Sequence, residues 1–360
     1  MDFINCHIHT FTIDHVPNRF LPFHLVKLLR LKIVRKPLGW LLRTVLPFTD
    51  RDLLDRYINF IEITANKNQR HTLNRVRSYY PLNTRFIVLT MDMKYMRAGK
   101  VKEDLDSQLE ELLKLYQEFP DTIIPFIAVD PRRENILELV KKYIEEHNFK
   151  GIKIYPRLGF YPNDKRLEPI YKYAQEQKIP ILSHCARGGV FTKKITHNML
   201  DHPWRGRVKK IKAKHFSHYF TEPMNYKSIL KDFPDLKICL AHFGGYDEWD
   251  AFLENAWDPE NPDLSKKSWM SEIIDLMKEH PNLYTDISYT AFHSSRYFPL
   301  MSVLLDDTEI KDRIMFGSDY YMIEREKESE REMALKVRYA LGEEKFKMIS
   351  GINIKNFIGE

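Results

Sequence analysis

The chain has 360 residues, of which 43% are hydrophobic and 13% aromatic, as in a globular protein with a large core. Its net charge of +6 is concentrated in one segment, since residues 16–48 hold seven Lys and Arg and no acid. Subtracting these seven charges leaves −1 for the rest, which argues against a nucleic-acid-binding protein with a broad basic face. No stretch is apolar enough to span a membrane, and no signal-peptide pattern begins the chain, so we expect a cytoplasmic protein.

Short apolar runs with strand character alternate with amphipathic helical patterns along the whole chain. The strand-like runs are 3–11, 86–92, 123–130, 151–155, 180–185, 237–243, 283–288 and 314–319. The helical patterns are 104–119, 134–147, 166–177, 226–232, 269–279 and 328–341. Eight strand units joined by helical crossovers predict an α/β fold, a (β/α)8 TIM barrel formed as one domain over residues 1–360. No Gly-x-Gly-x-x-Gly follows the first strand, which argues against a dinucleotide-binding fold.

Two connections are unusually long. Residues 15–50 form a basic amphipathic insertion after the first strand, broken by Pro22, Pro37 and Pro47. We interpret it as a lid or subunit contact, which predicts a homo-oligomer; binding to an anionic membrane surface or partner is the alternative. The connection 186–236 after the fifth strand is also too long for an ordinary loop, and such loops are usually functional.

The three cysteines, Cys6, Cys185 and Cys239, each fall within a predicted strand. Their odd number and wide spacing do not form a disulfide framework. We therefore expect buried, reduced thiols.

Residues of the metal-ligand type lie at the ends of five predicted strands. They are His7, His9, Lys153, His184, His242 and Asp319. Parallel α/β barrels place their chemistry at the carboxyl ends of the strands, which would bring these side chains together. Each also has an ordinary structural explanation: a hydrogen-bonded buried histidine, or, for Asp319, a helix cap. Taken together, three histidines and a carboxylate suit Zn²⁺ or a similar divalent cation and leave one histidine for proton transfer.

Several short motifs then resemble one known family. The segments are His7-Ile-His9, Gly151-Ile-Lys-Ile-Tyr-Pro156, Ile181-Leu-Ser-His184, Leu240-Ala-His-Phe-Gly-Gly245, Tyr284-Thr-Asp-Ile-Ser288 and Phe316-Gly-Ser-Asp319. In order and spacing they resemble the amidohydrolase superfamily. The branch they match is the amidohydrolase-related one, which includes aminocarboxymuconate semialdehyde decarboxylase.

The resemblance implies a role for each strand-end residue. It makes His7, His9, His184 and Asp319 the ligands of one divalent metal ion, most often Zn²⁺, and His242 the residue that polarises or deprotonates the bound water. Lys153 matches a lysine that is carboxylated and bridges two metals in binuclear members. The text around it is similar to the mononuclear branch, so a bridging role and a second metal are not favoured.

The implied chemistry is that of a metal-dependent hydrolase acting on a small organic substrate of the amide, ester or lactone type. The metal would make hydroxide available near neutral pH, with His242 as proton acceptor and Asp319 passing a proton to the leaving group. The alternative is a metal-dependent non-oxidative decarboxylase of a small carboxylic acid, because the ligand set does not separate the two.

Four basic residues are candidates for substrate contact, because each falls in a predicted carboxyl-end loop. They are Arg157, Arg187, His218 and His293. For Arg187 the functional interpretation is that its planar fork holds a substrate carboxylate, and the alternative is a solvated loop charge. Asp286, inside the seventh strand, is expected to support a neighbouring ligand and not to touch substrate.

Overall fold

The structure is a computed structural model that describes residues 3–21, 26–27, 30, 68–254, 267–323 and 329–360. One eight-stranded sheet forms its centre, in the order β1-β2-β3-β4-β5-β8-β9-β10, and every neighbouring pair is parallel. The strands are β1 Ile4–His9, β2 Arg85–Leu89, β3 Ile123–Val129, β4 Gly151–Ile154, β5 Ile181–Ala186, β8 Ile238–Gly244, β9 Leu283–Asp286 and β10 Ile314–Met315. Each coincides with one of the eight predicted strands.

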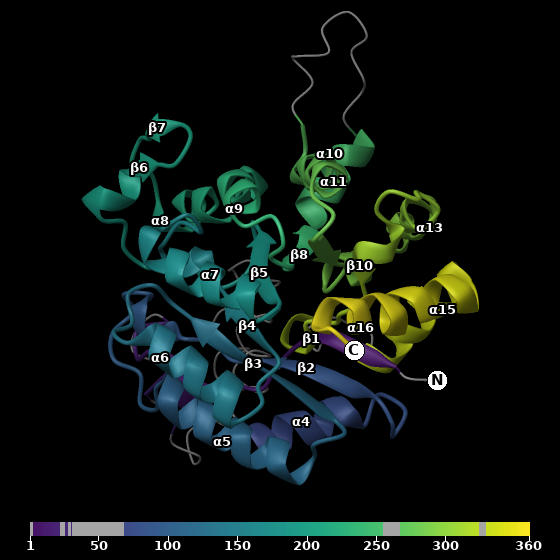
Figure 1. Cartoon of the computed structure of the whole chain (residues 1–360), viewed down its shortest axis with the longest axis horizontal. Helices are drawn as coiled ribbons and strands as arrows, with labels where there is room; N and C mark the ends of the chain where they lie inside the picture. The colour runs from purple at the N-terminus through teal and green to yellow at the C-terminus, as the bar shows by residue number, and fades with distance from the viewer. Residues whose placement is uncertain (1–2, 22–25, 28–29, 31–67, 255–266, 324–328) are drawn as a thin grey trace, which may run out of the picture.

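Backbone hydrogen bonds join the last strand to the first. The amide of Cys6 donates to the carbonyl of Phe316 at 3.0 Å, and the amide of Asp319 donates to the carbonyl of His7 at 2.8 Å. The sheet therefore curls into a barrel with helices around its outside (Figure 1). The predicted (β/α)8 fold is confirmed.

Helices occupy the connections between the strands, as the periodicity predicts. The six predicted patterns correspond to α5 Leu105–Glu118, α6 Ile136–Lys141, α7 Glu168–Glu176, α9 Lys227–Asp232, α11 Trp269–Glu279 and α15 Glu330–Lys347. Further helices were not predicted: α4 Gln69–Arg77, α8 Ala213–Phe216, α10 Tyr246–Glu254, α12 Thr290–His293, α13 Phe298–Leu304, α14 Tyr320–Ile323 and α16 Asn353–Ile358. Most of these are a few turns or less, too short for a clear helical period.

The barrel interior is apolar at one end. Ile4, Ile87, Ile124 and Leu182 pack there with Phe357 of α16, which covers that end of the barrel. A second, larger cluster lies between the outer face of the sheet and the helices.

The first strand departs from the expected alternation. A period of two places Cys6 and Ile8 on the same face, but Cys6 packs with Ile4 inside the barrel and Ile8 packs in the outer cluster. The pairing of β1 with β2 shifts register between Asn5 and Ile8, as at a β-bulge. A bulge inserts an extra residue and interrupts the alternation, which explains why Cys6 and Ile8 face opposite sides of the sheet.

The long connections have different outcomes. Most of the basic insertion 15–50 lies outside the described residues, so its role as a lid or subunit contact remains a prediction. Where it is described, Arg30 forms an ion pair with Asp14 at 3.2 Å and donates to the carbonyl of Val16 at 2.7 Å. The connection after β5 is an ordered layer containing the hairpin β6 Asp201–His202 and β7 Gly206–Arg207, with α8 and α9.

The three cysteines are buried and form no disulfide, as predicted. Within the part of the chain that the structure describes, none of the helices is long and apolar enough to cross a bilayer.

Candidate active site

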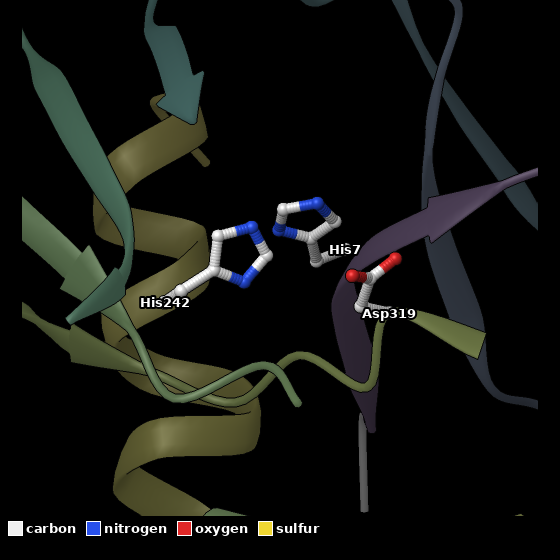
Figure 2. A group of neighbouring side chains, drawn as sticks. All are labelled: His7, His242 and Asp319. Atoms are coloured by element: carbon white, nitrogen blue, oxygen red, sulfur yellow. The ribbon is translucent and has the colours of Figure 1, made fainter. Parts of the chain in front are cut away.

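The strand ends bring the predicted ligand-type residues to one end of the barrel. His7 and His9 lie on β1, His184 on β5 and His242 on β8, while Asp319 follows β10. Figure 2 shows His7, His242 and Asp319 projecting toward one another from separate segments. One ligand atom from each of these three lies within 4.8 Å of the other two, close enough for one cation.

Two of these residues have an unusual backbone. His242 has φ of 67° and Asp319 has φ of 55°, in the left-handed region that residues other than glycine rarely adopt. Such conformations cost about 1–3 kcal/mol each and persist where the surrounding structure enforces them, commonly at active sites. Neither conformation could be predicted from residue type.

His9 and His184 border the same space. The His9 ring centroid lies 5.4 Å from that of His7, and its Nδ1 is 2.9 Å from the Leu89 carbonyl, which leaves Nε2 free of that bond. His184 is 3.0 Å from His242, Nδ1 to Nε2, and its Nε2 is 3.1 Å from the Gly188 carbonyl. The structure thus brings all four histidines together. His242 lies close enough to His7 and Asp319 to share a cation with them.

Asp286 supports the site from below. Its Oδ2 lies 3.0 Å from His7 Nδ1, and its Oδ1 accepts from the amide of His242 at 3.0 Å. Burial alone would raise the pKa of Asp286, but His7 and the other groups around the carboxylate hold that pKa well below its usual range. A carboxylate on Nδ1 keeps Nε2 as the lone-pair nitrogen of a metal-binding histidine, the supporting position that the sequence suggests for Asp286.

The imidazoles around the site are held neutral. Burial, together with the charge of His7, lowers the pKa of His242 to about 4. Burial also lowers the pKa of His9 and of His184 well below the ordinary value. Neutral imidazole is the form that binds a metal ion.

Lys153 lies inside the barrel on β4, fully buried, and its Nζ has no hydrogen-bond partner among the described residues. Burial lowers its pKa to about 8, although the negative charges of Asp286 and Asp319 oppose that shift. Lys153 therefore lies close enough to these two carboxylates for their charges to act on it. The expectation that Lys153 does not bridge a second metal ion stays a prediction.

A pocket of about 710 Å³, its open mouth included, extends outward from the histidines. Its base includes His9, His184, His242 and Asp319. Its walls are largely apolar and aromatic: Phe11, Met91, Tyr155, Val190, Tyr246, Tyr289 and Tyr321. Tyr155 stacks on His184 with ring centroids 4.2 Å apart. These wall residues share one sequence signal, which is a position just beyond a strand end.

The four substrate candidates occupy different places. Arg187 lines the pocket, hydrogen-bonds through Nε to Glu248, and lies over the ring of Trp269 at 4.2 Å. Arg157 is buried behind the wall, and His218 is half-buried on the long connection. His293 is exposed and stacks on Tyr246, with ring centroids 3.9 Å apart. Only Arg187 of these four belongs to the pocket wall.

The family of the chain follows from comparison with known sequences. The family model described as amidohydrolase matches residues 4–355. The chain belongs to the amidohydrolase family. The resemblance predicted from the strand-end motifs is thereby confirmed, and with it the expectation of an enzyme of this superfamily.

Solved structures of distant members share the fold. A 5-carboxyvanillate decarboxylase from Novosphingobium aromaticivorans, complexed with manganese, is 17% identical, with 100% of this chain and 96% of that one covered and a TM-score of 0.59. A dihydroxybenzoic acid decarboxylase from a Polaromonas species, with bound manganese, is 16% identical over 99% and 97%, with a TM-score of 0.57. A 4-oxalomesaconate hydratase from Rhodopseudomonas palustris is 15% identical over 99% and 95%, with a TM-score of 0.51.

Proposed function

We propose that this amidohydrolase is a metal-dependent, non-oxidative decarboxylase of a small aromatic carboxylic acid. The observation that carries the proposal is the pocket, which joins a base of imidazoles and one carboxylate to walls of aromatic side chains. Similar structures that are named as decarboxylases of aromatic acids also support this function. Hydrolysis, the first expectation from the sequence, becomes the second candidate.

The residues present fit a divalent cation. His7 and His9 each have Nδ1 engaged, with Asp286 and with the Leu89 carbonyl, so both can offer Nε2. His184 and Asp319 complete the ligand set expected from the family, while His242 is the fifth group near it. Three imidazoles and a carboxylate suit Zn²⁺, and the manganese of the similar decarboxylases makes Mn²⁺ the second choice.

When bound, the cation would supply Lewis acidity that holds the substrate's oxygens and spreads their negative charge. The chain's own groups then handle the proton. Cleaving the bond between ring and carboxylate releases CO₂ and leaves an electron pair on the ring carbon, which takes one proton. Asp319 and His242 both line the pocket and could deliver it, from a carboxyl oxygen or from a ring nitrogen.

The aromatic walls would position the ring. Phe11 and Tyr321 stack on one another with centroids 4.6 Å apart, and Tyr246 and Tyr289 face the same pocket. Flat apolar walls exclude water and favour a planar ligand. Arg187, on the rim, offers its remaining N–H groups to a substrate oxygen.

Hydrolysis is favoured by one specific observation. His242 is buried and neutral at pH 7, and one of its ring nitrogens lies within 4.8 Å of ligand atoms of His7 and Asp319. That is the position of a general base for an attacking water.

One experiment separates the two reactions. The protein loaded with Zn²⁺ or Mn²⁺ is incubated with a panel of hydroxybenzoates and, separately, of aryl esters and lactones in H₂¹⁸O. Decarboxylation predicts CO₂ release without ¹⁸O in the aromatic product. Incorporation of ¹⁸O with no CO₂ would overturn the proposal in favour of hydrolysis, and a His242→Ala variant, with unchanged metal content, serves as the inactive control.

A further inference from the structure

A buried asparagine joins the two segments that carry His7 and Asp319. Asn5 lies on β1 and is fully buried. Its Oδ1 accepts from the amide of His7 at 3.2 Å and from the amide of Ser318 at 3.1 Å. His7 follows Asn5 by two residues, whereas Ser318 is 313 residues away and directly precedes Asp319. One side-chain oxygen thus links the first strand to the turn after the last strand.

The side-chain amide of Asn5 uses its two donors as well. Its Nδ2 donates to Ser318 Oγ at 2.8 Å and to the hydroxyl of Tyr80 at 3.2 Å. The Tyr80 hydroxyl in turn donates to Glu330 Oε1 at 2.6 Å, at the start of α15. Because backbone amides only donate, the two amides on Oδ1 fix the orientation of this side chain. All four hydrogen bonds that an asparagine side chain can make are therefore formed inside the protein.

Asn5 also belongs to the irregular part of β1. The amide of His7 donates to Asn5 Oδ1 within the stretch where the register of β1 with β2 shifts, between Asn5 and Ile8. A short polar side chain that bonds the amide two residues further on offers the backbone an alternative to the strand ladder. Bulges of this kind change the direction of a side chain next to an active site. Asn5 therefore holds the bulge from which the His7 side chain projects.

Backbone hydrogen bonds hold the turn that carries Asp319. The Asp319 amide donates to the carbonyl of His7 at 2.8 Å, and the carbonyl of Ser318 accepts from the amide of Tyr289 at 3.1 Å. With the bond from the Ser318 amide to Asn5, three hydrogen bonds fix the peptide groups around Ser318. Asp319 has φ of 55°, a conformation that persists only where the surrounding structure enforces it.

We propose that Asn5 is a positioning residue that sets the separation of His7 and Asp319 required by a divalent cation. Asn5 is not among the residues that line the pocket, so it acts through the amides of His7 and Ser318. The inference rests on the proposed function only in that His7 and Asp319 are metal ligands there. Without the shared acceptor, their ligand atoms would no longer be held within 4.8 Å before the cation binds. Supporting groups of this kind typically contribute about 10–100-fold to metal affinity.

Zn²⁺ affinity tests the proposal without a known substrate. The metal-free full chain is titrated with Zn²⁺ in competition with a chelating dye, for the unmodified protein, Asn5→Ala and Asn353→Ala. We expect Zn²⁺ to bind about tenfold more weakly in Asn5→Ala. Asn353 is the matched control, because it is equally buried and donates to the carbonyls of Lys311 and Ile314, at the opposite end of β10 from Asp319. Asn353→Ala should lower the melting temperature similarly and leave the Zn²⁺ affinity unchanged.

Two further variants separate positioning from stability. Asn5→Asp keeps an acceptor for both amides but loses the two donors, so the melting temperature should fall while most of the Zn²⁺ affinity is recovered. Asn5→Ser, which decides if Asn5→Ala does not fold, can bond the nearby His7 amide but is too short to reach Ser318. It should bind Zn²⁺ about fivefold more weakly than the unmodified protein.

Three results would overturn the proposal. They are an unchanged Zn²⁺ affinity in folded Asn5→Ala or Asn5→Ser, an equal loss of affinity in Asn353→Ala, and no recovery in Asn5→Asp. With a substrate found by the CO₂ screen, positioning predicts a lower kcat and an unchanged KM in Asn5→Ala, because Asp319 handles the proton. Weaker Zn²⁺ binding in Asn5→Ala without any CO₂ release supports the positioning role and counts against decarboxylation alone.

Discussion

The two ends of the barrel interior are built from the same strands and differ in nearly every physical property. At one end Ile4, Ile87, Ile124 and Leu182 pack as buried hydrocarbon under Phe357. At the other, buried histidines lie around Asp319, with neutral imidazoles and left-handed backbone at His242. Burial of apolar area stabilises the first end, whereas desolvated polar groups and backbone strain destabilise the second. The apolar end therefore stabilises the fold, and the polar end keeps its strained geometry because the rest of the fold is stable.

The largest effect should come from the polar end. Asp319→Asn keeps the shape of the side chain but removes its charge and its ability to transfer a proton. We expect turnover of the substrate found by the CO₂ screen to fall about 10³-fold. The melting temperature should change little. Asp312→Asn, at an exposed site, is the control, and near-normal turnover in Asp319→Asn would exclude this carboxylate from the chemistry.

The apolar end should respond in the opposite way. Leu182→Ala removes buried hydrocarbon next to Cys239 and should lower the free energy of unfolding by about 2–5 kcal/mol. Turnover per folded molecule should stay within about twofold, measured below the melting transition. Leu335→Ala, at a side chain that is 56% exposed, should leave stability unchanged. A large loss of turnover in Leu182→Ala would mean that the two ends are not separable.

Lowering the pH should reduce the free energy of unfolding, because histidines at the polar end become protonated in the unfolded chain. The pKa of His242 is lowered to about 4, so in the metal-free protein the unfolded chain binds protons below about pH 6.5 while the native state does not. Stability is therefore present above pH 6.5 and falls as the pH drops toward 4, by about 3 kcal/mol from His242 alone. Urea unfolding at several pH values measures this, and His242→Asn should flatten the profile. An unchanged slope in that variant would assign the acid sensitivity to other groups.

The smallest effect is expected at Lys153. If one cation is bound without a carboxylated lysine, Lys153→Met should leave the metal content near one per chain by elemental analysis. Lys172→Met, at an exposed lysine on α7, is the matched control. A content near two per chain that falls in Lys153→Met would instead establish Lys153 as a bridge, the interpretation that the sequence did not favour.

Much of the site was predictable because its residues are fixed by local position. His7, His184 and His242 each lie within a short apolar run, and a run of that length predicts a strand whatever surrounds it. Which of these groups come close enough to share one cation was not predictable. The distances among His7, His242 and Asp319 depend on how three distant strands register in the closed barrel and on left-handed turns that residue type does not encode.

The sequence by itself determined the barrel, the strand ends and the kinds of side chain found there, because strand period and residue chemistry are local properties. Tertiary structure alone decided that a bulge places Cys6 inside the barrel, that His293 lies outside the pocket wall, and that Arg157 is buried with no counter-ion in the described part of the chain. These are contacts between residues far apart in the chain, and only the folded packing sets which side chains lose water and which partners they meet.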